Sequence, residues 1–205
     1  MAKAKLESLK VGTRFKYGSK SAVVLDKMDD GVLCIVMDEN YRAVFDEERS
    51  SNFAKSTLYH ELHTVYLGRW LNEGADLHDF VEMKVDLKTN DSTGGYGICE
   101  VLFAPMTSIQ YEKYKELIPS ADDWEWTVTP SSSHRVQYIK SDGSLGNGNA
   151  YSSYNVRPLF KLKSDTEVQI GEVPENMTLE DAVQKLIDEY GVKEVLRVVS
   201  QINIW

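Results

Sequence analysis

The chain has 205 residues, of which 42% are hydrophobic and 27% are charged, and its formal net charge is −9. This composition is typical of a globular protein that buries a sizeable core without disulfides or metal ions. The negative charge argues against general nucleic-acid binding, which needs Lys and Arg to neutralise phosphates, and it is compatible with a basic partner surface.

The two cysteines, Cys34 and Cys99, lie far apart, each within an apolar run. Two such cysteines do not form a disulfide framework, so we expect buried free thiols in a reducing compartment. The first residues lack the apolar core of a signal peptide, and no run approaches the roughly 18 apolar residues of a membrane span. We therefore expect a cytoplasmic protein without membrane contact.

Residues 11–45 have the pattern of β-structure. Two apolar runs, Ala22–Leu25 and Val32–Met37, flank the residues Asp29-Asp30-Gly31. Because Asp-Gly favours tight turns between strands, the pattern predicts a hairpin or a meander.

Residues 56–72 have helical spacing. Ser56 is the expected N-cap and Gly74 the expected stop. The predicted inward stripe is Leu58, Leu62, Val65 or Tyr66, and Trp70. Residues 77–87 predict a second short helix.

The middle of the chain alternates between polar and apolar segments. Residues 88–97 predict a polar loop, and residues 98–105, "ICEVLFAP", a buried strand. Residues 107–117 predict a short helix, which Thr107 caps and Pro119 ends. Its predicted inward residues are Ile109, Tyr111 or Tyr114, and Leu117.

Three further strands are expected between residues 122 and 162. In "DDWEWTVTP", Trp124, Trp126 and Val128 alternate onto one face. Short strands at "RVQYIK" and "VRPLFKL" flank the polar loop "DGSLGNGNAYSSYN". In this loop Asp142-Gly143 predicts a tight turn. Positions 146–148, Gly-Asn-Gly, are residue types that tolerate a positive φ.

The last part of the chain differs in composition. Residues 164–177 suit a connector, and residues 178–203 read as two amphipathic helices separated by Gly191. Helices with one apolar face do not stand alone in water. They dock on the main domain, or pair with a second copy or another partner.

Several segments together resemble a known family. They are "SNFAKSTLYHELHTVYLGRWLN", "VLFAPMTSIQYEKY", "DWEWTVTP", "VQYIKSDGSLG" and "NVRPLFKL". Their order and residue types resemble the domain-of-unknown-function family 6273 of Gram-positive bacteria, their phages and other mobile elements. Two positions depart from its markers: Val128 stands where the family has Arg, and Asn155 where it has Gly.

The resemblance implies an α+β fold that is C-type-lectin-like, as in the formylglycine-generating enzyme. Such a domain has small twisted antiparallel sheets, two or three helices and long loops. It would span residues 8–163, followed by the connector 164–177 and a C-terminal helical hairpin at 178–203. The oxidase chemistry of the formylglycine-generating enzyme needs a close cysteine pair late in the domain, and this chain has no cysteine after Cys99.

No catalytic or metal-ligating set stands out. In "HELH" the residues His60 and His63 are three apart, whereas a zinc-protease helix needs two His four apart. A calcium site in the 142–155 loop would use Asp142, Asn147, Asn149 and Asn155, and turn chemistry explains the same residues. We therefore expect no catalytic residues, no metal and no cofactor.

Two polar loops with tyrosines are the candidate recognition surface, because Tyr among Gly, Ser and Asn is typical of binding loops. The candidate binding residues are Tyr96, Asn147, Asn149, Tyr151, Tyr154 and Arg157. Local packing is the alternative role for the tyrosines. For Arg157 the alternative is tying loop carbonyls or a carboxylate together.

We expect a non-enzymatic recognition protein of a phage or mobile element that binds a protein partner, possible roles including an acidic counter-defence inhibitor. The alternatives are a phage structural or receptor-binding component, in which the C-terminal helices form a homo-oligomer, and an enzyme with an unrecognised site.

Overall fold

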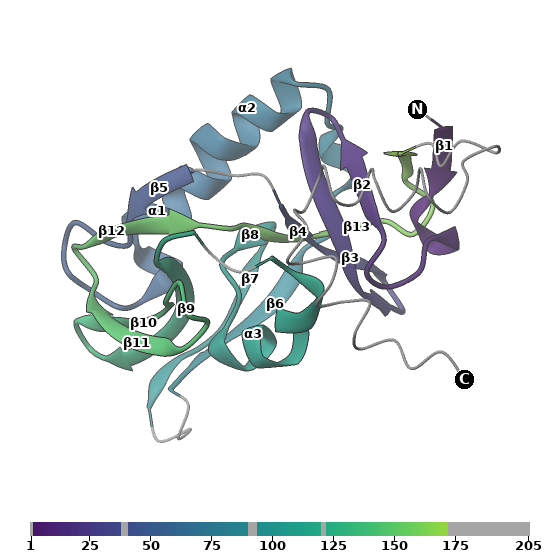
Figure 1. Cartoon of the computed structure of the whole chain (residues 1–205). Coiled ribbons are helices and arrows are strands. Elements are labelled where there is room, and N and C mark those ends of the chain that lie inside the picture. The colour runs from purple at the N-terminus through teal and green to yellow at the C-terminus, as the bar shows by residue number, and fades with distance from the viewer. Residues whose placement is uncertain (1, 38–40, 90–93, 120–121, 172–205) are drawn as a thin grey trace, which may run out of the picture. The chain divides into compact units, whose positions relative to one another are not determined.

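A computed structural model of the chain describes residues 2–37, 41–89, 94–119 and 122–171. It shows a mixed α+β protein with mainly antiparallel sheets and two short helical segments, which confirms the predicted class (Figure 1). Contacts within the chain define one compact unit at Met1–Ile170. The helical hairpin predicted at 178–203 lies outside the described residues. None of the described helices is long and apolar enough to cross a membrane.

The largest sheet has seven strands in the order β1-β14-β2-β3-β4-β13-β8. Its strands are β1 (Ala2–Lys5), β2 (Arg14–Tyr17), β3 (Lys20–Met28), β4 (Gly31–Val36), β8 (Phe103–Ala104), β13 (Leu159–Leu162) and β14 (Glu167–Ile170). Every residue of β4 is buried, so this strand runs through the core.

The predicted hairpin at Asp29-Asp30-Gly31 is confirmed, since β3 and β4 pair in antiparallel fashion on either side of this turn. Gly31 is required here for a second reason. A Cβ on Gly31 would lie 2.5 Å from the carbonyl oxygen of Leu162. The neighbouring strand β13 therefore approaches too closely for any larger residue.

The first helical segment consists of α1 (Thr57–Glu61), the π-helical turn η3 (Leu62–Tyr66) and α2 (Leu67–Asn72). Ser56 is the N-cap, as predicted, and its Oγ accepts from the amide of Tyr59 at 3.1 Å. Of the two alternatives for the inward stripe, Tyr66 is buried whereas Val65 is 60% exposed. The segment ends before Gly74, whose φ of +99° suits glycine.

The second helical segment is α3 (Ser108–Tyr114), followed by the 3-10 turn η5 (Lys115–Leu117). Thr107 is the N-cap, as predicted, and it forms a full capping box with Gln110. The predicted inward position Ile109 is wrong, because Ile109 is 72% exposed. Tyr111 and Tyr114 are both buried instead, so the apolar face is turned toward them.

The helix predicted at 77–87 is wrong. A single 3-10 turn, η4 (Leu77–Asp79), precedes the strand β6 (Met83–Lys88). In β6 buried and exposed residues alternate strictly, and Met83, Val85 and Leu87 point inward. This period of two competes with the helical spacing and prevails, since β6 has a strand to pair with.

That strand is β7 (Gly95–Val101), which pairs with β6 in a two-stranded sheet. It corrects two predictions: part of the polar loop 88–97 is strand, and the "ICEVLFAP" segment is not uniformly buried. Ile98 is 65% exposed, while Phe103 in β8 is fully buried. The start of this segment therefore lies at the surface and its end in the core.

The five-stranded sheet has the order β11-β10-β9-β12-β5. Its strands are β5 (Tyr41–Val44), β9 (Glu125–Ser132), β10 (Arg135–Ile139), β11 (Leu145–Asn149) and β12 (Ser153–Val156). Eight residues of the predicted loop 142–155 thus belong to the strands β11 and β12, and tight turns precede and follow β11. This corrects the expectation of one long polar loop.

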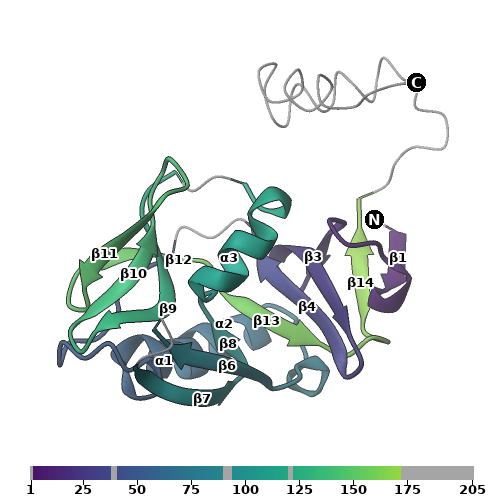
Figure 2. The same ribbon diagram turned by 90° about the horizontal axis from the view of Figure 1, so that it is seen from below.

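The predicted domain boundaries are too narrow. Within the predicted connector, β14 pairs with β1 and with β2. Val168 in β14 is 1% exposed. Strands from both ends of the described chain therefore complete the seven-stranded sheet (Figure 2).

Candidate functional site

An aromatic cluster fills the inner face of the five-stranded sheet. Tyr154 packs against Trp126 with ring centroids 4.3 Å apart and against Tyr138 at 4.9 Å. Trp124 stacks on Tyr138 at 4.9 Å and remains 40% exposed at the end of the cluster. The predicted binding residue Tyr154 is thus partly buried and packs against other rings. Local packing is the alternative role that the sequence analysis gave for the tyrosines.

Gly146 and Gly148 make room for these rings. A Cβ on Gly146 would lie 2.6 Å from Cζ of Tyr138, and one on Gly148 would lie 2.8 Å from Cε2 of Tyr154. Neither glycine has a positive φ, whereas Gly143 in the predicted turn has a φ of +79°. The glycines of β11 therefore serve close ring packing and not turn formation.

The opposite face of β10 and β11 carries polar side chains. Arg135 pairs with Asn149 across the two strands, and Gln137 pairs with Asn147. Side chains alternate along a strand, so these four residues point away from the aromatic cluster. Arg135 and Asn147 are exposed to solvent.

Tyr151 lies in the turn between β11 and β12, next to this face. Its hydroxyl accepts from Nδ2 of Asn149 at 3.2 Å, and its ring is 52% exposed. The guanidinium of Arg49 lies over the ring, 5.0 Å from its centroid. Four residues here are exposed and Asn149 is half-buried beside them. We call the set formed by Arg49, Arg135, Asn147, Asn149 and Tyr151 the Tyr151 surface.

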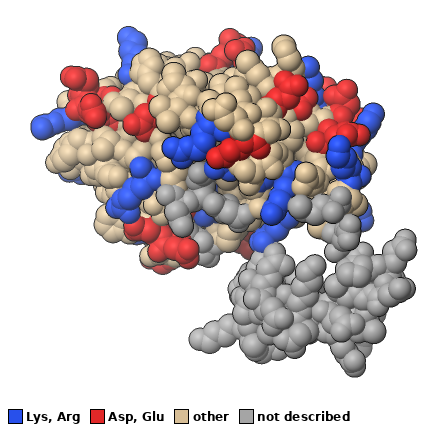
Figure 3. Space-filling view, turned by 90° about the horizontal axis from the view of Figure 1, so that it is seen from above, with Lys and Arg blue, Asp and Glu red and all other residues tan. Residues whose placement is uncertain are grey.

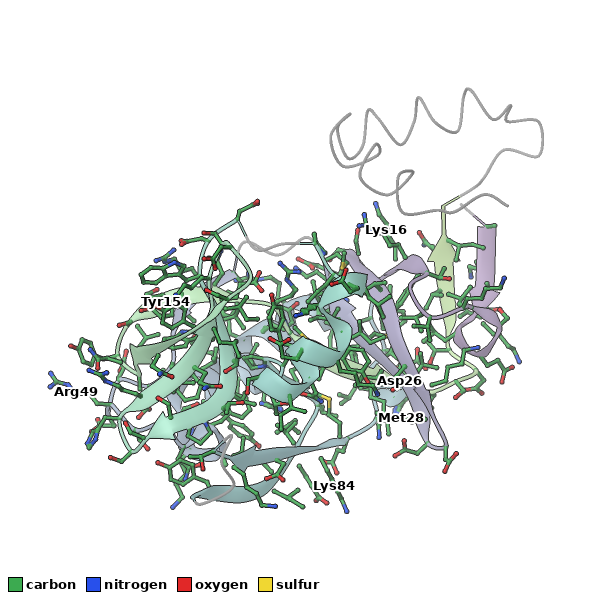
Figure 4. The ribbon with its side chains drawn as sticks, turned by 60° about the horizontal axis from the view of Figure 1, so that its bottom comes forward. Lys16, Asp26, Met28, Arg49, Lys84 and Tyr154 are labelled. Atoms are coloured by element: carbon green, nitrogen blue, oxygen red, sulfur yellow. The ribbon has the colours of Figure 1, made fainter. Side chains whose placement is uncertain are left out.

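Arg49 has an unusual backbone. Its φ is +62°, and it is the one non-glycine residue with a positive φ in the described part of the chain. Such a conformation costs about 1 kcal/mol or more and persists only where surrounding contacts impose it. Figure 4 shows the Arg49 side chain projecting outward at the end of the molecule that carries the five-stranded sheet.

Asp46 imposes this conformation. Its carbonyl accepts from the amide of Arg49, and its buried carboxylate accepts from the amides of Ser50 at 2.8 Å and Thr57 at 3.1 Å. Its own amide donates to the carbonyl of Ala150 at 2.9 Å. The 46–52 loop is therefore anchored both to the start of α1 and to the turn that carries Tyr151.

Tyr96 contacts the same loop from β7. Its hydroxyl lies 2.9 Å from Oγ of Ser51, which in turn donates to the carbonyl of Ser132 at 2.5 Å. The 46–52 loop thus contacts both Tyr96 and Tyr151, which are 55 positions apart in the sequence. Sequence reasoning assigned no role to this loop, although a buried Asp ahead of a Ser-rich stretch is a signal for side-chain-stabilised turns.

Arg157 is buried and has a structural role, as its stated alternative predicted. Its guanidinium donates to the carboxylate of Glu125 at 2.5 Å and to the carbonyl of Pro119 at 3.0 Å. Burial raises the pKa of Glu125, and the charge of Arg157 partly offsets that effect. This residue is not part of the Tyr151 surface.

Burial disfavours the reactive thiolate form of both cysteines. Cys34 is buried, and burial raises the pKa of its thiol far above the usual range. Cys99 is only partly buried, and burial with the nearby charge of Glu100 also raises its pKa. A high pKa keeps a thiol protonated and a poor nucleophile.

The second histidine of "HELH", His63, uses both ring nitrogens in hydrogen bonds. Nε2 of His63 accepts from the amide of Leu102 at 3.1 Å, so Nδ1 carries the proton and donates to the carbonyl of Tyr59 at 2.8 Å. Both ring nitrogens are therefore occupied. Across the described ranges, no group of three or more His, Cys, Asp or Glu side chains is placed to hold a metal ion.

Two of the four residues suggested for calcium have other hydrogen-bond partners. Oδ1 of Asp142 accepts from the amide and the hydroxyl of Ser144 at 2.9 and 2.6 Å, and these bonds lower the pKa of its carboxyl. The Asn149 amide donates to Tyr151. Turn and surface contacts thus account for the side chains of Asp142 and Asn149.

Comparison with known proteins adds no relative to this picture. No protein-family model, no curated protein and no solved structure matches the chain.

Proposed function

We propose that this protein is a non-enzymatic recognition protein that binds a protein partner through the Tyr151 surface. The observation that carries the proposal is the exposed Tyr151–Arg49 stack, with Arg49 held at a φ of +62°. Strained backbone and exposed aromatic rings are both enriched where proteins bind partners. Neither feature is needed for the core.

The anchoring of the 46–52 loop supports the same proposal. A buried carboxylate, Asp46, fixes the loop before any partner arrives, so little conformational entropy is lost on binding. Tyr with an Arg cation above its ring also supplies a large contact area with few rotatable bonds. We further propose a C-type-lectin-like scaffold, a resemblance that leaves room for recognition surfaces of this kind.

A more specific form of this proposal is an acidic counter-defence inhibitor that binds a basic partner. The charges on the surface of the molecule bear on this form. Figure 3 shows acidic and basic side chains intermixed over one face of the molecule. The Tyr151 surface itself carries two arginines, which favours an acidic partner. Replacing both arginines by Gln would weaken binding to an acidic partner and strengthen binding to a basic one. The sign of that change therefore separates the two versions.

A photo-crosslinking amino acid placed at position 151 tests the proposal in cells that express the protein. We expect one protein to be captured from position 151 and not from position 109, because Ile109 is even more exposed than Tyr151 but lies in another element, α3. Tyr151→Ala in the purified chain should then weaken binding of the captured protein by tenfold or more, roughly 1.4 kcal/mol.

Arg49→Gly provides a second, sharper variant. Glycine adopts a φ of +62° without strain, so we expect the free energy of unfolding to stay constant or rise by up to about 1 kcal/mol. Binding should nevertheless fall, because the cation over Tyr151 is lost. Unchanged binding by both Tyr151→Ala and Arg49→Gly would refute a role of this surface.

A structural phage component remains a second proposal, with oligomers formed through residues 178–203. The mass in solution of the full chain against that of a chain ending at Ile170 tests it. If both chains have the mass of a monomer, this proposal is excluded.

A further inference from the structure

The edges of the sheets differ in how open they are to a further strand. Edge strands of natural proteins are usually protected by shortness, by lysines or by bulges. In this protein β8 has two residues, and β1 carries Lys3 and Lys5. In β7 the register shifts opposite Asp86–Lys88, and Gly97 has a φ of +78°. These three edges are therefore poor templates for pairing.

The edge strand β11 lacks these protections. Its sequence, Leu-Gly-Asn-Gly-Asn, contains no proline and no charged residue. It pairs with β10 over five positions without a register shift. Within the described residues β10 is the one strand that pairs with β11, and Figure 2 shows β11 at the outer end of the sheet.

The pairing with β10 shows which backbone groups point outward. The amide of Lys140 donates to the carbonyl of Ser144, and the amide of Ala150 donates to the carbonyl of His134. Hydrogen-bonded positions alternate along an antiparallel ladder, so Gly146 and Gly148 direct their backbone groups toward β10. Leu145, Asn147 and Asn149 direct theirs toward the open edge.

Asn147 lies at the centre of that edge. The carbonyl of Asn149 already accepts from the amide of Ser152 at 2.8 Å, which closes the following turn. The amide and carbonyl of Asn147 remain as the central donor and acceptor. The rings of Tyr138 and Tyr154 lie against Gly146 and Gly148, so they hold the strand in place for an incoming chain.

The surroundings of the edge favour negative charge. Arg135 lies opposite Asn149 on the face that also carries Asn147, and Arg49 lies over Tyr151 just beyond the strand. Neither arginine forms an ion pair with any described residue. Carboxylates are the side chains that such arginines bind most strongly.

We propose that the partner adds an extended acidic segment to β11 as a sixth strand of the five-stranded sheet. Main-chain hydrogen bonds to Asn147 would provide affinity, and carboxylates near Arg135 and Arg49 would provide specificity. This inference rests on the proposed function, because it gives the chemistry of the partner at the Tyr151 surface.

The test uses the full chain and two hexapeptides with blocked ends, one of alternating Glu and Val and one of alternating Lys and Val. We expect the Glu peptide to bind with a Kd of about 1 mM or tighter, and the Lys peptide to bind at least about tenfold more weakly. Arg135→Glu should reverse this order. Titration calorimetry measures both, and no detectable binding of the Glu peptide would overturn the inference.

Two substitutions at one position isolate the main-chain contribution. Asn147→Pro removes an outward amide without touching the β10 ladder, and proline is tolerated at such edge positions. We expect about a tenfold loss of peptide binding with unchanged thermal unfolding. Asn147→Ala keeps the amide and removes only the side chain, so it should bind the Glu peptide at least about threefold more tightly than Asn147→Pro does.

If Asn147→Pro does not fold, a Glu peptide with methylated backbone nitrogens tests the same contact. Methylation removes the main-chain hydrogen-bond donors of the peptide and leaves the protein unchanged. Equal binding of the methylated and unmethylated peptides would overturn strand addition. If Tyr151→Ala still weakens binding of the crosslinked partner in that case, the proposed function is retained and only strand addition is rejected. A chain that dimerises through β11 in an Asn147-dependent manner, without binding the Glu peptide, would also overturn it.

Discussion

At the scale of single residues, the buried pair of Arg157 and Glu125 sets the stability of the segment that leads into β9. Both side chains are about one-tenth exposed, at 10% and 9%. Removing one partner of a buried pair leaves the other charge without compensation, which typically costs about 3–5 kcal/mol. We therefore expect Arg157→Met to lower the free energy of unfolding by that amount. Adding Glu125→Gln should recover part of the loss, as urea unfolding would show.

The same pair gives a direction for the pH dependence. Because burial raises the folded-state pKa of Glu125 above its unfolded value, this group favours the folded state most below the unfolded pKa. Its contribution falls as pH rises through the folded-state pKa. Arg157→Met should raise that pKa further and shift the loss to higher pH. Parallel pH profiles for the natural chain and Arg157→Met would contradict this assignment.

His63 predicts the opposite pH dependence. Burial lowers its pKa, with a smaller contribution from the neighbouring charge of His60. A lowered folded-state pKa means that stability is complete above the unfolded value of about 6.5 and is lost as pH falls toward the folded-state pKa. Protonation of Nε2 would break its bond from the amide of Leu102. We expect His63→Gln to reduce the slope of stability against pH below about 6.5.

The candidate residues show what sequence reasoning reached and where it failed. Asn147, Asn149 and Tyr151 were predicted as candidate binding residues because turn-type residues beside a tyrosine indicate a surface. In the structure Asn147 and Tyr151 are exposed and Asn149 is half-buried. Tyr154 was placed on the same surface, but strand pairing turns its ring toward Trp126. Arg49 was missed, because its role depends on a contact with a residue about 100 positions away. Contacts of this kind carry no local sequence signal.

At the scale of elements, β11 is a strand whose sequence resembles a loop. Gly and Asn have low strand propensity, so the pattern predicts a turn. Ring packing against the glycines overrides this propensity, and the pairing with β10 makes the segment a strand. The helices were predicted more accurately because Ser56 and Thr107 act as caps through local contacts, which sequence does encode.

Ring packing predicts that the glycines of β11 do not tolerate a side chain. Gly148→Ala would place Cβ 2.8 Å from the Tyr154 ring and 3.2 Å from the Tyr138 ring. We expect a loss of about 1–3 kcal/mol in the free energy of unfolding, the usual cost of overpacking. The matched control is Asn147→Ala on the opposite face, with an expected change below about 0.5 kcal/mol. Equal effects of the two substitutions would contradict the ring-packing role.

A second variant links this effect to the rings. Tyr154→Leu removes the ring that opposes position 148, so Gly148→Ala should be less destabilising in that background. The coupling between the two sites in a double-mutant cycle should reach about 0.5 kcal/mol or more. Additive effects would mean that Gly148 is required for another reason.

At the scale of the whole molecule, sequence reasoning found the α+β class but not the extent of the fold. The segment 164–177 was interpreted as a connector because it contains polar residues, a glycine and a proline. Its first half instead contains β14, whose partner β1 lies at the other end of the described chain. A pairing between strands more than 160 residues apart cannot be predicted from local composition, because four alternating residues are too few to indicate a strand.

The position of β14 predicts where the chain can be shortened. A chain ending at Ile170 keeps the compact unit, so we expect its thermal unfolding to remain cooperative with a midpoint close to that of the full chain. A chain ending at Lys163 loses the buried Val168 and the carbonyls of Ser164 and Thr166, which accept from the amides of Glu7 and Leu6. Burial of one Val and two backbone hydrogen bonds together amount to about 3 kcal/mol or more. We expect a loss of at least this size in urea unfolding, with earlier proteolysis at residues 2–8, which form β1 and the following 3-10 turn. Equal stability of the two shortened chains would place β14 outside the cooperative unit and restore the boundary at residue 163.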